Sequence, residues 1–361
     1  MTYKEIVKYQ KKLNAIWGSA LNDNLFSYKV ELFKQKKPTL MVLGSSRVVQ
    51  MREQFFNSSF ANCGLAMSHL NEGIMFLEEI LKFHHPELIL LGLDFWWFND
   101  AHPQPPTFPQ HNKDGSGNLL YKIRQPFVWL RNNKISLRQL MEVTLFGNTK
   151  NDITKYDNMG IAAIKYSQGF RKDGSFFDSK ILFGLDPKVA DIQFKITFSW
   201  IDKGGSRVEY GDRISPGRLQ QFQKIMEICR GNNIPLIVFL PPMAPKVYQK
   251  METMPREYAY IQGLRNYLPT LPLEAYDFHD ISEVSRNDCE FFDGFHGGDV
   301  LSQKMLLSIV EKNPQSALRK YLNIPLMTAK IKEFSGHVLT KYHKQMYNLD
   351  ETDFLHLGCK K

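Results

Sequence analysis

The chain has 361 residues, of which 43% are hydrophobic and 23% charged, so it can bury the core of one large α/β domain or of two smaller ones. Its formal net charge of +9 is mild for this length, and its basic ends lack the interleaved aromatic residues of a single-strand groove, so we expect no nucleic-acid partner. No run approaches the roughly 18 apolar residues that cross a bilayer.

The two ends of the chain are rich in lysine and are predicted to be helical. Residues 1–37 form a charged lead-in that ends at Pro38, and residues 313–361 form a basic C-terminal extension. The lead-in could make a weak contact with a membrane surface or a membrane protein, although a solvated helical face is the simpler interpretation. The N-terminus lacks a signal-peptide pattern, so we expect a cytoplasmic location from the sequence as given, and an envelope location if the N-terminus is incomplete.

Between residues 38 and 312, short apolar runs alternate with helical patterns, which is typical of a parallel sheet covered by helices. We predict a three-layer α/β/α domain with about five parallel strands. The predicted strands are 39–43, 59–62, 87–93, 234–240 and 273–278. The predicted helices are 47–56, 68–83, 216–230, 245–267 and 299–311, the last with Asp299 as its N-cap. Residues 101–210 interrupt this alternation and are predicted to be a partly irregular insertion that serves as a lid or recognises substrate.

The four cysteines show neither a CxxC pair nor a metal-ligand spacing with histidine, so we expect reduced structural thiols at Cys63, Cys229, Cys289 and Cys359. The chain also lacks the GxGxxG and HExxH patterns. We therefore expect neither a metal nor a cofactor.

Unusual polar residues follow the first three predicted strands, where the sites of open α/β sheets form. Ser45 and Ser46 follow the first strand after Gly44, Asn62 and Gly64 end the second, and Asp94 follows the third. A serine in such a turn can present its hydroxyl to a crevice. The pattern does not decide which of the two serines does so, and both could simply cap the next helix.

Asp293 and His296 lie three residues apart, just ahead of the last predicted helix of the domain. An aspartate at this spacing can hold the tautomer of the imidazole, and a serine hydroxyl needs such a base before it can act as a nucleophile. An ordinary polar loop is the alternative interpretation. His279 and Asp280 form a weaker alternative pair.

The order Gly-x-Ser, Asn-x-Gly and Asp-x-x-His resembles the SGNH (GDSL-like) hydrolase superfamily, whose fold is flavodoxin-like. It looks most like the bacterial DltD-like and AlgX/AlgJ-like proteins of cell-envelope O-acylation. The resemblance covers residues 38–100 and 214–312. It implies that Ser46 is the nucleophile, that His296 is the base oriented by Asp293, and that the amides of Ser46 and Gly64 form an oxyanion hole.

The third block departs from the family, which usually has Gly-x-Asn-Asp where this chain has Gly92-Leu93-Asp94. An ionised Asp94 cannot donate a hydrogen bond. Asn62 or Asn99 could replace the missing donor, the hole could have two donors, or the chain could be an incompetent hydrolase. The candidate substrate contacts are Arg47, Asp94, Trp96, Trp97 and Asn99, with an exposed arginine and packed tryptophans as the simpler interpretation.

The resemblance implies a serine-dependent ester hydrolase or O-acyltransferase that acts on an acylated glycan, an envelope polymer or a related ester. The alternative is a catalytically inactive protein of the same fold that binds or assembles polysaccharide or meets a membrane-surface partner.

Overall fold

The computed structural model describes residues 1–18, 24–104, 119–133, 135–146, 149–150, 157–182, 190–341 and 353–359. Its centre is a parallel sheet of five strands in the spatial order β10-β9-β4-β2-β3. The strands are β2 (Leu40–Gly44), β3 (Phe60–Gly64), β4 (Leu88–Gly92), β9 (Leu236–Leu240) and β10 (Glu274–Asp277). Every residue of the first four is buried, as both faces of a parallel sheet require. The predicted strands are confirmed to within two residues at each end.

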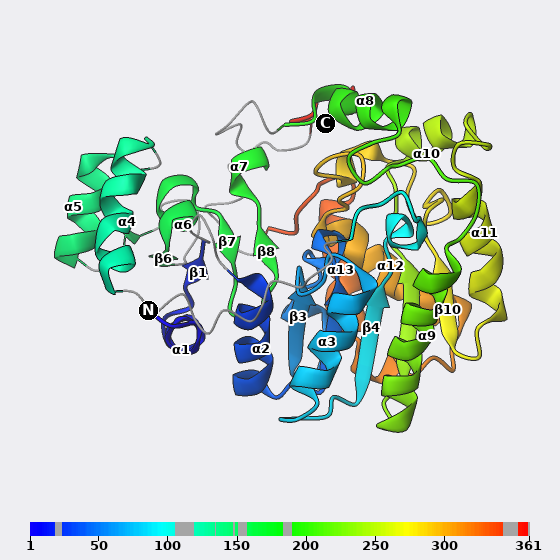
Figure 1. Ribbon diagram of the computed structural model, residues 1–361, viewed down its shortest axis with the longest axis horizontal. Helices are drawn as coiled ribbons and strands as arrows, with labels where there is room; N and C mark the ends of the chain where they lie inside the picture. The colour runs from blue at the N-terminus through cyan, green and yellow to red at the C-terminus, as the bar shows by residue number, and fades with distance from the viewer. Residues whose placement is uncertain are drawn as a thin grey trace.

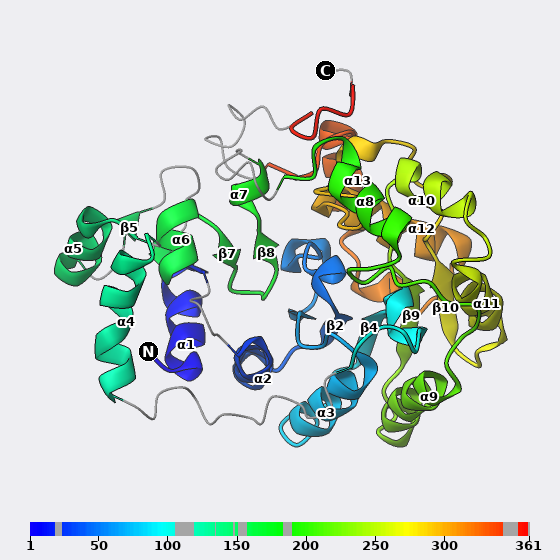
Figure 2. The ribbon, with the colours of Figure 1, turned by 45° about the horizontal axis from the view of Figure 1, so that its top comes forward.

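Helices cover both faces of this sheet (Figures 1 and 2), which makes the domain α/β. On one face lie α2 (Leu25–Lys36), α3 (Leu70–Ile80), α9 (Pro216–Gly231) and α11 (Ala259–Tyr267). On the other lie α12 (Asp299–Lys312) and α13 (Ile324–Phe334), which pack together. Within the described parts of the chain, no helix combines the length and the apolar character that a membrane crossing requires.

The predicted helix 47–56 is instead two 3-10 turns, Ser46–Val48 and Glu53–Phe55. The Asn62 side-chain amide donates to the carbonyls of Val48, at the end of the first turn, and of Met51, between the two turns. The Val48 carbonyl also accepts from the Met51 amide three residues later, which is the bonding of a 3-10 turn rather than of an α-helix.

Two further helix predictions need correction. The predicted helix 245–267 is divided into α10 (Pro245–Glu252) and α11, because Pro255 falls between them and lacks an amide donor. The N-cap of α12 is Gly298 rather than Asp299. The Asp299 carboxylate turns inward, where it pairs with Arg52 at 3.1 Å and accepts from the Thr340 amide.

A second, mixed sheet joins the N-terminal lead-in to the mid-chain insertion. Its order is β5-β6-β1-β7-β8, and its one strand from the lead-in, β1, pairs with β6 and β7 of the insertion. The strands are β1 (Ile16–Trp17), β5 (Thr149–Lys150), β6 (Asp157–Met159), β7 (Gly169–Phe170) and β8 (Phe176–Phe177). The predicted boundary at residue 37 therefore separates segments that fold together.

The helices of these segments are α1 (Tyr3–Leu13), α4 (Leu119–Arg131), α5 (Leu137–Phe146), α6 (Ile161–Tyr166), α7 (Ser179–Leu182) and α8 (Lys195–Lys203). The insertion is thus less irregular than predicted, although residues 105–118 and 183–189 lie outside the described part. In the C-terminal extension, α13 and the 3-10 turn Arg319–Tyr321 are helical, and residues 342–352 lie outside the described part.

Buried contacts hold the second sheet against the carboxyl edge of the central one. The Lys29 ammonium donates to the carbonyls of Asn62 at 2.9 Å and Gly174 at 2.6 Å, and it lies 4.3 Å from the centre of the Phe170 ring. The amide of Phe176 in β8 donates to the carbonyl of Val49. The insertion is therefore anchored beside the turn that follows β2.

Candidate functional site

The turn after β2 lies flat on the sheet because glycines end three neighbouring strands. A Cβ on Gly92 would lie 2.5 Å from Val48 Cγ1, and a Cβ on Gly64 would lie 2.8 Å from Val49 Cγ1. Both distances are shorter than a van der Waals contact. Glycine at these positions therefore lets the 3-10 turn settle on the carboxyl edge and present its first residue, Ser46.

The two serines of this turn have different surroundings. Ser45 is buried, and its hydroxyl accepts a hydrogen bond from the Arg47 amide at 3.2 Å, as an N-cap does. Ser46 is partly exposed, and its Oγ lies 2.7 Å from His296 Nε2. Capping thus falls to Ser45, and Ser46 is the serine that faces a base.

His296 is held by a tightly bonded loop ahead of α12. Its Nδ1 lies 2.8 Å from each carboxylate oxygen of Asp293. Asp293 Oδ1 also accepts from the amides of Phe295 at 2.8 Å and His296 at 2.9 Å, and the Phe292 amide donates to the His296 carbonyl. The loop therefore fixes the ring in the orientation that directs Nε2 at Ser46.

The pKa values of this pair follow from their mutual attraction. Burial alone would raise the pKa of Asp293, but the charge and hydrogen bond of His296 and the two backbone amides outweigh it and hold the pKa at about 2. Burial alone would lower the pKa of His296, but the Asp293 carboxylate outweighs it and raises that pKa above 6.5. Asp293 therefore stays ionised at neutral pH and stabilises a proton on His296.

Arg47 is a buried connector rather than an exposed ligand for an anion. Its side chain is fully buried, with Nη1 3.4 Å from Asp94 Oδ1. Its other donors reach the carbonyls of Pro241 at 2.8 Å, Pro242 at 2.6 Å and Phe295 at 3.1 Å. This one side chain ties the ends of β4 and β9 to the loop that carries His296.

The pair formed by Arg47 and Asp94 also defines the electrostatics behind Ser46. Burial raises the pKa of the Asp94 carboxyl, and the Arg47 charge opposes that rise. Because both side chains are fully buried, neither reaches a substrate. Contrary to the prediction from the sequence, Arg47 and Asp94 therefore do not bind substrate but position the residues around Ser46.

Asn62 and Gly64, the expected oxyanion donors besides Ser46, are bonded to each other. The Gly64 amide donates to Asn62 Oδ1 at 2.8 Å, while the Asn62 amide group is engaged by Val48 and Met51. Both donors are committed to the turn after β2, so they do not point freely into the site. Ser46 is the first residue of a 3-10 turn, and the amides of a first turn have no acceptor within the helix. The Ser46 amide is therefore the remaining candidate donor.

The remaining candidate contacts are packed inside the protein. Trp96 and Trp97 are 5% and 1% exposed, so neither offers an open face for a sugar ring. The Asn99 side chain donates to the carbonyls of Glu209 and Tyr210. His279 is fully buried, and burial lowers its pKa to about 3, so it does not act as an alternative base.

Asp178 is a carboxylate that the sequence analysis missed. It follows β8 in the insertion, and its neighbour Phe177 packs in one cluster with Phe292. Burial raises the pKa of Asp178 to about 6, with Asp293 raising it further and His296 lowering it. Its Oδ1 is buried and has no hydrogen-bond partner within the described ranges. No motif marks it, because the fold of the insertion alone brings it near His296.

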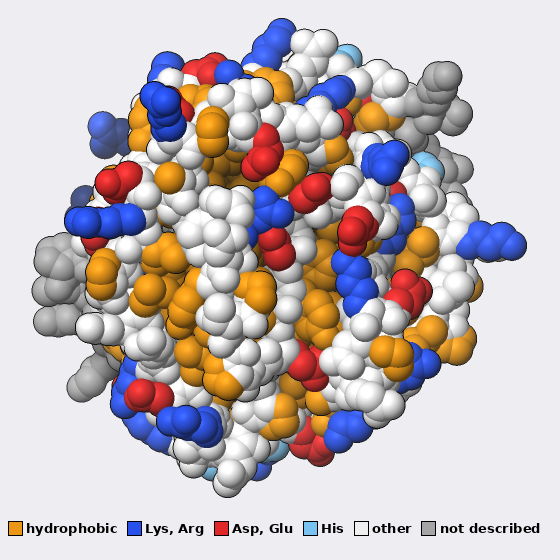
Figure 3. All heavy atoms as spheres, turned by 90° about the vertical axis from the view of Figure 1, so that its right-hand side faces the viewer, with side chains coloured by type: hydrophobic (Ala, Val, Ile, Leu, Met, Phe, Trp, Pro, Cys, Tyr) orange, Lys and Arg blue, Asp and Glu red, His pale blue; other side chains and the backbone are white. Residues whose placement is uncertain are grey.

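A cavity of about 530 Å³ lies away from this site, at the amino ends of β9 and β10. Its lining includes Met226, Arg230, Leu236 and Leu273. Figure 3 shows apolar side chains gathered among charged ones on the side of the molecule that carries α9, α11 and β10. None of the residues that meet at Ser46 lines this cavity.

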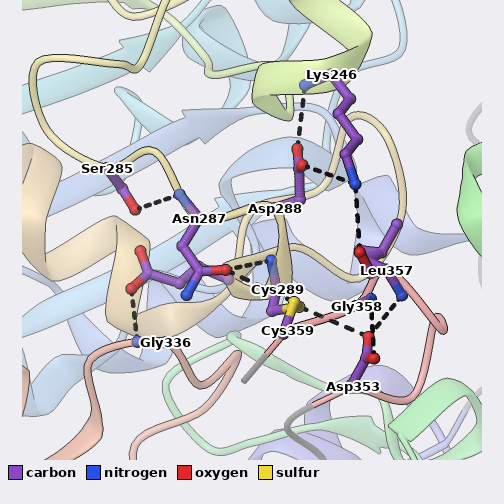
Figure 4. The surroundings of a disulfide bond; sticks show 11 residues. Lys246, Ser285, Asn287, Asp288, Cys289, Gly336, Asp353, Leu357, Gly358 and Cys359 are labelled. Atoms are coloured by element: carbon purple, nitrogen blue, oxygen red, sulfur yellow. Dashed lines mark hydrogen bonds and ion pairs between the residues drawn. A yellow bond between two sulfur atoms is a disulfide. The ribbon is translucent and has the colours of Figure 1, made fainter. Parts of the chain in front are cut away.

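A disulfide joins Cys289 to Cys359 and fastens the C-terminal segment to the turn just ahead of the Asp293 loop (Figure 4). Asp353 accepts from the amides of Leu357 and Gly358 beside it. The expectation of four reduced thiols is wrong for this pair, because the sequence does not reveal that two residues 70 apart meet.

The other two cysteines, Cys63 and Cys229, are free and buried, as expected. Within the described ranges, the group of three potential metal ligands is Cys289, Cys359 and Asp353, and two of its three members form the disulfide.

Comparisons with protein-family models, with curated proteins and with solved structures find no match to this chain.

Proposed function

We propose that the protein is a serine-dependent ester hydrolase or O-acyltransferase of the SGNH type. The observation that carries the proposal is the continuous path from Ser46 Oγ to His296 Nε2 at 2.7 Å and from His296 Nδ1 to Asp293 at 2.8 Å. This is the arrangement of nucleophile, base and orienting carboxylate that acyl transfer requires.

The strand order supports the same proposal. Taken in chain order, the central strands follow the sequence 2-1-3-4-5 across the sheet, which is the flavodoxin-like order. In such sheets ligands bind at the carboxyl edge, at the switch point between the first and third strands. Here those strands are β2 and β4, and Ser46 follows β2 directly.

In the proposed mechanism, His296 Nε2 takes the proton of the Ser46 hydroxyl as Oγ attacks the acyl carbonyl. The Ser46 amide donates to the developing oxyanion. The tetrahedral intermediate then expels the alcohol, which takes the proton from His296, and the acyl group stays on Ser46. A water molecule or a sugar or polyol hydroxyl then attacks this ester by the same steps in reverse. The preference for a glycan or envelope-polymer substrate rests on the family resemblance.

The disulfide between Cys289 and Cys359 supports an oxidising compartment for this chemistry, since disulfides persist there and are rare in a reducing cytoplasm. We therefore propose that the protein acts outside the cytoplasm, in place of the cytoplasmic location expected from the sequence.

A second candidate, an inactive binding protein of the same fold, is favoured by one observation. The Gly64 amide donates to Asn62 Oδ1, and the Asn62 amide group donates to the Val48 and Met51 carbonyls, so the oxyanion site has one evident donor, the Ser46 amide. Loss of one donor costs an enzyme about 10²–10³ in kcat, which a binding protein would tolerate.

The test is labelling by a fluorophosphonate probe together with turnover of p-nitrophenyl acetate, on oxidised protein whose disulfide has been verified by mass spectrometry. We expect labelling at Ser46 and turnover above the buffer rate. Ser46→Ala should abolish labelling, and both Ser46→Ala and His296→Ala should lower turnover by about 10³-fold or more.

Ser45→Ala is the matched control, since it changes the neighbouring hydroxyl and should keep most of the activity. If the wild type neither reacts with the probe nor hydrolyses the ester, the proposal of an enzyme fails. Retention of a glycan by both wild type and Ser46→Ala would then support the binding protein.

A further inference from the structure

Most of the large apolar side chains that the protein exposes lie at the end formed by α1, α4 and α5. Helices α4 and α5 stand at the far side of the second sheet from the central one, with α1 at the same end (Figures 1 and 2). Of the ten large hydrophobic residues that are exposed in the described ranges, seven lie in or next to these three helices. These are Met1, Tyr9, Leu13, Phe127, Leu137, Met141 and Leu145.

The exposed residues of α5 form one stripe. Leu137, Met141 and Leu145 are spaced by four, so they lie on the same side of the helix. They are 61%, 51% and 73% exposed, and Phe127 of α4 is 66% exposed. A stripe at this spacing is typical of a helix side that packs against something. Within the described part of the chain nothing covers it.

The charge of the same helices is strongly positive. Over their 34 residues, α1, α4 and α5 carry eight basic and two acidic side chains, a net +6 of the +9 of the whole chain. Arg124 and Arg131 of α4 and Lys8 and Lys12 of α1 are exposed. Apolar side chains that alternate with basic ones on short helices are typical of elements that lie in the plane of a membrane interface.

We propose that α1, α4 and α5 form a docking surface for an anionic lipid membrane. Phe127, Leu137, Met141 and Leu145 enter the boundary between headgroups and acyl chains, and the basic side chains meet the phosphate groups. The charge decides in favour of lipid over a second copy of this chain, since two copies would bring the same net positive charge together. The helices lie on the membrane, because their 10 to 13 residues are too few to cross it.

The test is sedimentation of the full chain with vesicles of phosphatidylcholine alone and of phosphatidylcholine mixed with phosphatidylglycerol, at low and high salt. We expect the wild type to bind the anionic vesicles and to lose affinity at high salt. The double variant Phe127→Ser/Leu145→Ser should lower affinity roughly tenfold at either salt concentration. Arg124→Gln/Arg131→Gln should lower it at low salt and weaken the salt dependence.

The matched control is Phe83→Ser/Trp200→Ser, which removes two exposed aromatic residues elsewhere and should bind as the wild type does. Ser46→Ala should also bind fully, so this proposal stands or falls independently of the enzyme. Equal binding by the Phe127/Leu145 variant, or no binding by the wild type, would overturn it. A dimer in sedimentation velocity that the same variant abolishes would overturn it in favour of self-association.

Discussion

The two sheets of this protein differ in what holds them together. Strands β2, β3, β4 and β9 have five residues each and pair in register along buried ladders. In the second sheet β6 has three residues and the other strands have two. Such short strands are not stable alone, so the second sheet depends on side chains such as Gln10, which donates to the Phe170 carbonyl at 2.8 Å.

Because of this difference, the proposed catalytic residues and the residues proposed for recognition belong to sheets of different stability. Ser46, Arg47 and the His296 loop are attached to the rigid central sheet, whereas Asp178 and the exposed helices belong to the unit built on the second sheet. We therefore expect substitutions at the central edge to change catalysis or stability strongly. Substitutions in the second unit should change which substrate or surface is recognised and leave the geometry at Ser46 intact.

Among substitutions at the carboxyl edge of the central sheet, Asp293→Asn is expected to have the largest effect on catalysis. The amide no longer stabilises a proton on His296, so kcat/KM for p-nitrophenyl acetate should fall by about 10³–10⁴-fold. In the wild type, activity should rise with pH through the raised pKa of His296, above 6.5, because the base must be neutral. In the variant this acid limb should shift to lower pH.

The measurement is a pH–rate profile of the wild type and of Asp293→Asn, with Asp280→Asn as an exposed carboxylate control. An acid limb that stays in place in Asp293→Asn would show that Asp293 does not govern the titration of His296, and the proposed roles of both residues would be wrong.

Arg47→Met should have the largest effect on stability. It leaves the fully buried Asp94 carboxylate unpaired and removes the donors to Pro241, Pro242 and Phe295. We expect the free energy of unfolding, measured by urea titration, to fall by about 3–5 kcal/mol. Arg265→Met is the matched control, since its ion pair with Asp277 is partly exposed and should cost about 1 kcal/mol. Equal losses of unfolding free energy in the two variants would contradict the conclusion that Arg47 holds the ends of β4 and β9 to the His296 loop.

The central sheet could be predicted because three of its strands, β2, β4 and β9, are apolar runs of five residues between glycine, proline and helical patterns. The same regularity placed Ser46 and Asp94 at one edge, and the spacing of Asp293 and His296 suggested their pairing. The strands of the second sheet are too short for any periodicity. The pairing of β1 with a segment some 140 residues later follows from tertiary contacts that no local pattern records.

The roles of individual polar residues were harder to predict than their positions. Arg47, Trp96 and Asn99 have residue types that bind ligands when exposed, and burial, which the sequence does not give, turns them into structural contacts. Asn62 illustrates the same limit. Its amide is a plausible oxyanion donor by type, but the turn after β2 uses it to hold two carbonyls and the Gly64 amide.

The smallest effect is expected from Asp178→Asn, which tests whether the second unit contributes to substrate selection. The Asp178 side chain is half-buried beside the His296 loop, so its carboxylate can accept a hydrogen bond from a substrate hydroxyl. An O-acetylated monosaccharide that keeps free hydroxyls should therefore show a KM raised by about tenfold, the size of one charged hydrogen bond. Turnover of p-nitrophenyl acetate, which has no hydroxyl to offer, should change by less than about twofold.

Asp191→Asn provides the contrast for this test. Asp191 is also a carboxylate whose pKa is raised by burial and by Asp293, but its oxygens already accept from Thr197 and from the Ile196 amide. Asp191→Asn should lower stability, but it should not change the kinetics of the O-acetylated sugar and of p-nitrophenyl acetate by different factors. If Asp178→Asn slows both substrates equally, Asp178 acts through the charge it places near His296. The second unit would then influence the reaction itself, and the separation of the two regions would fail at this residue.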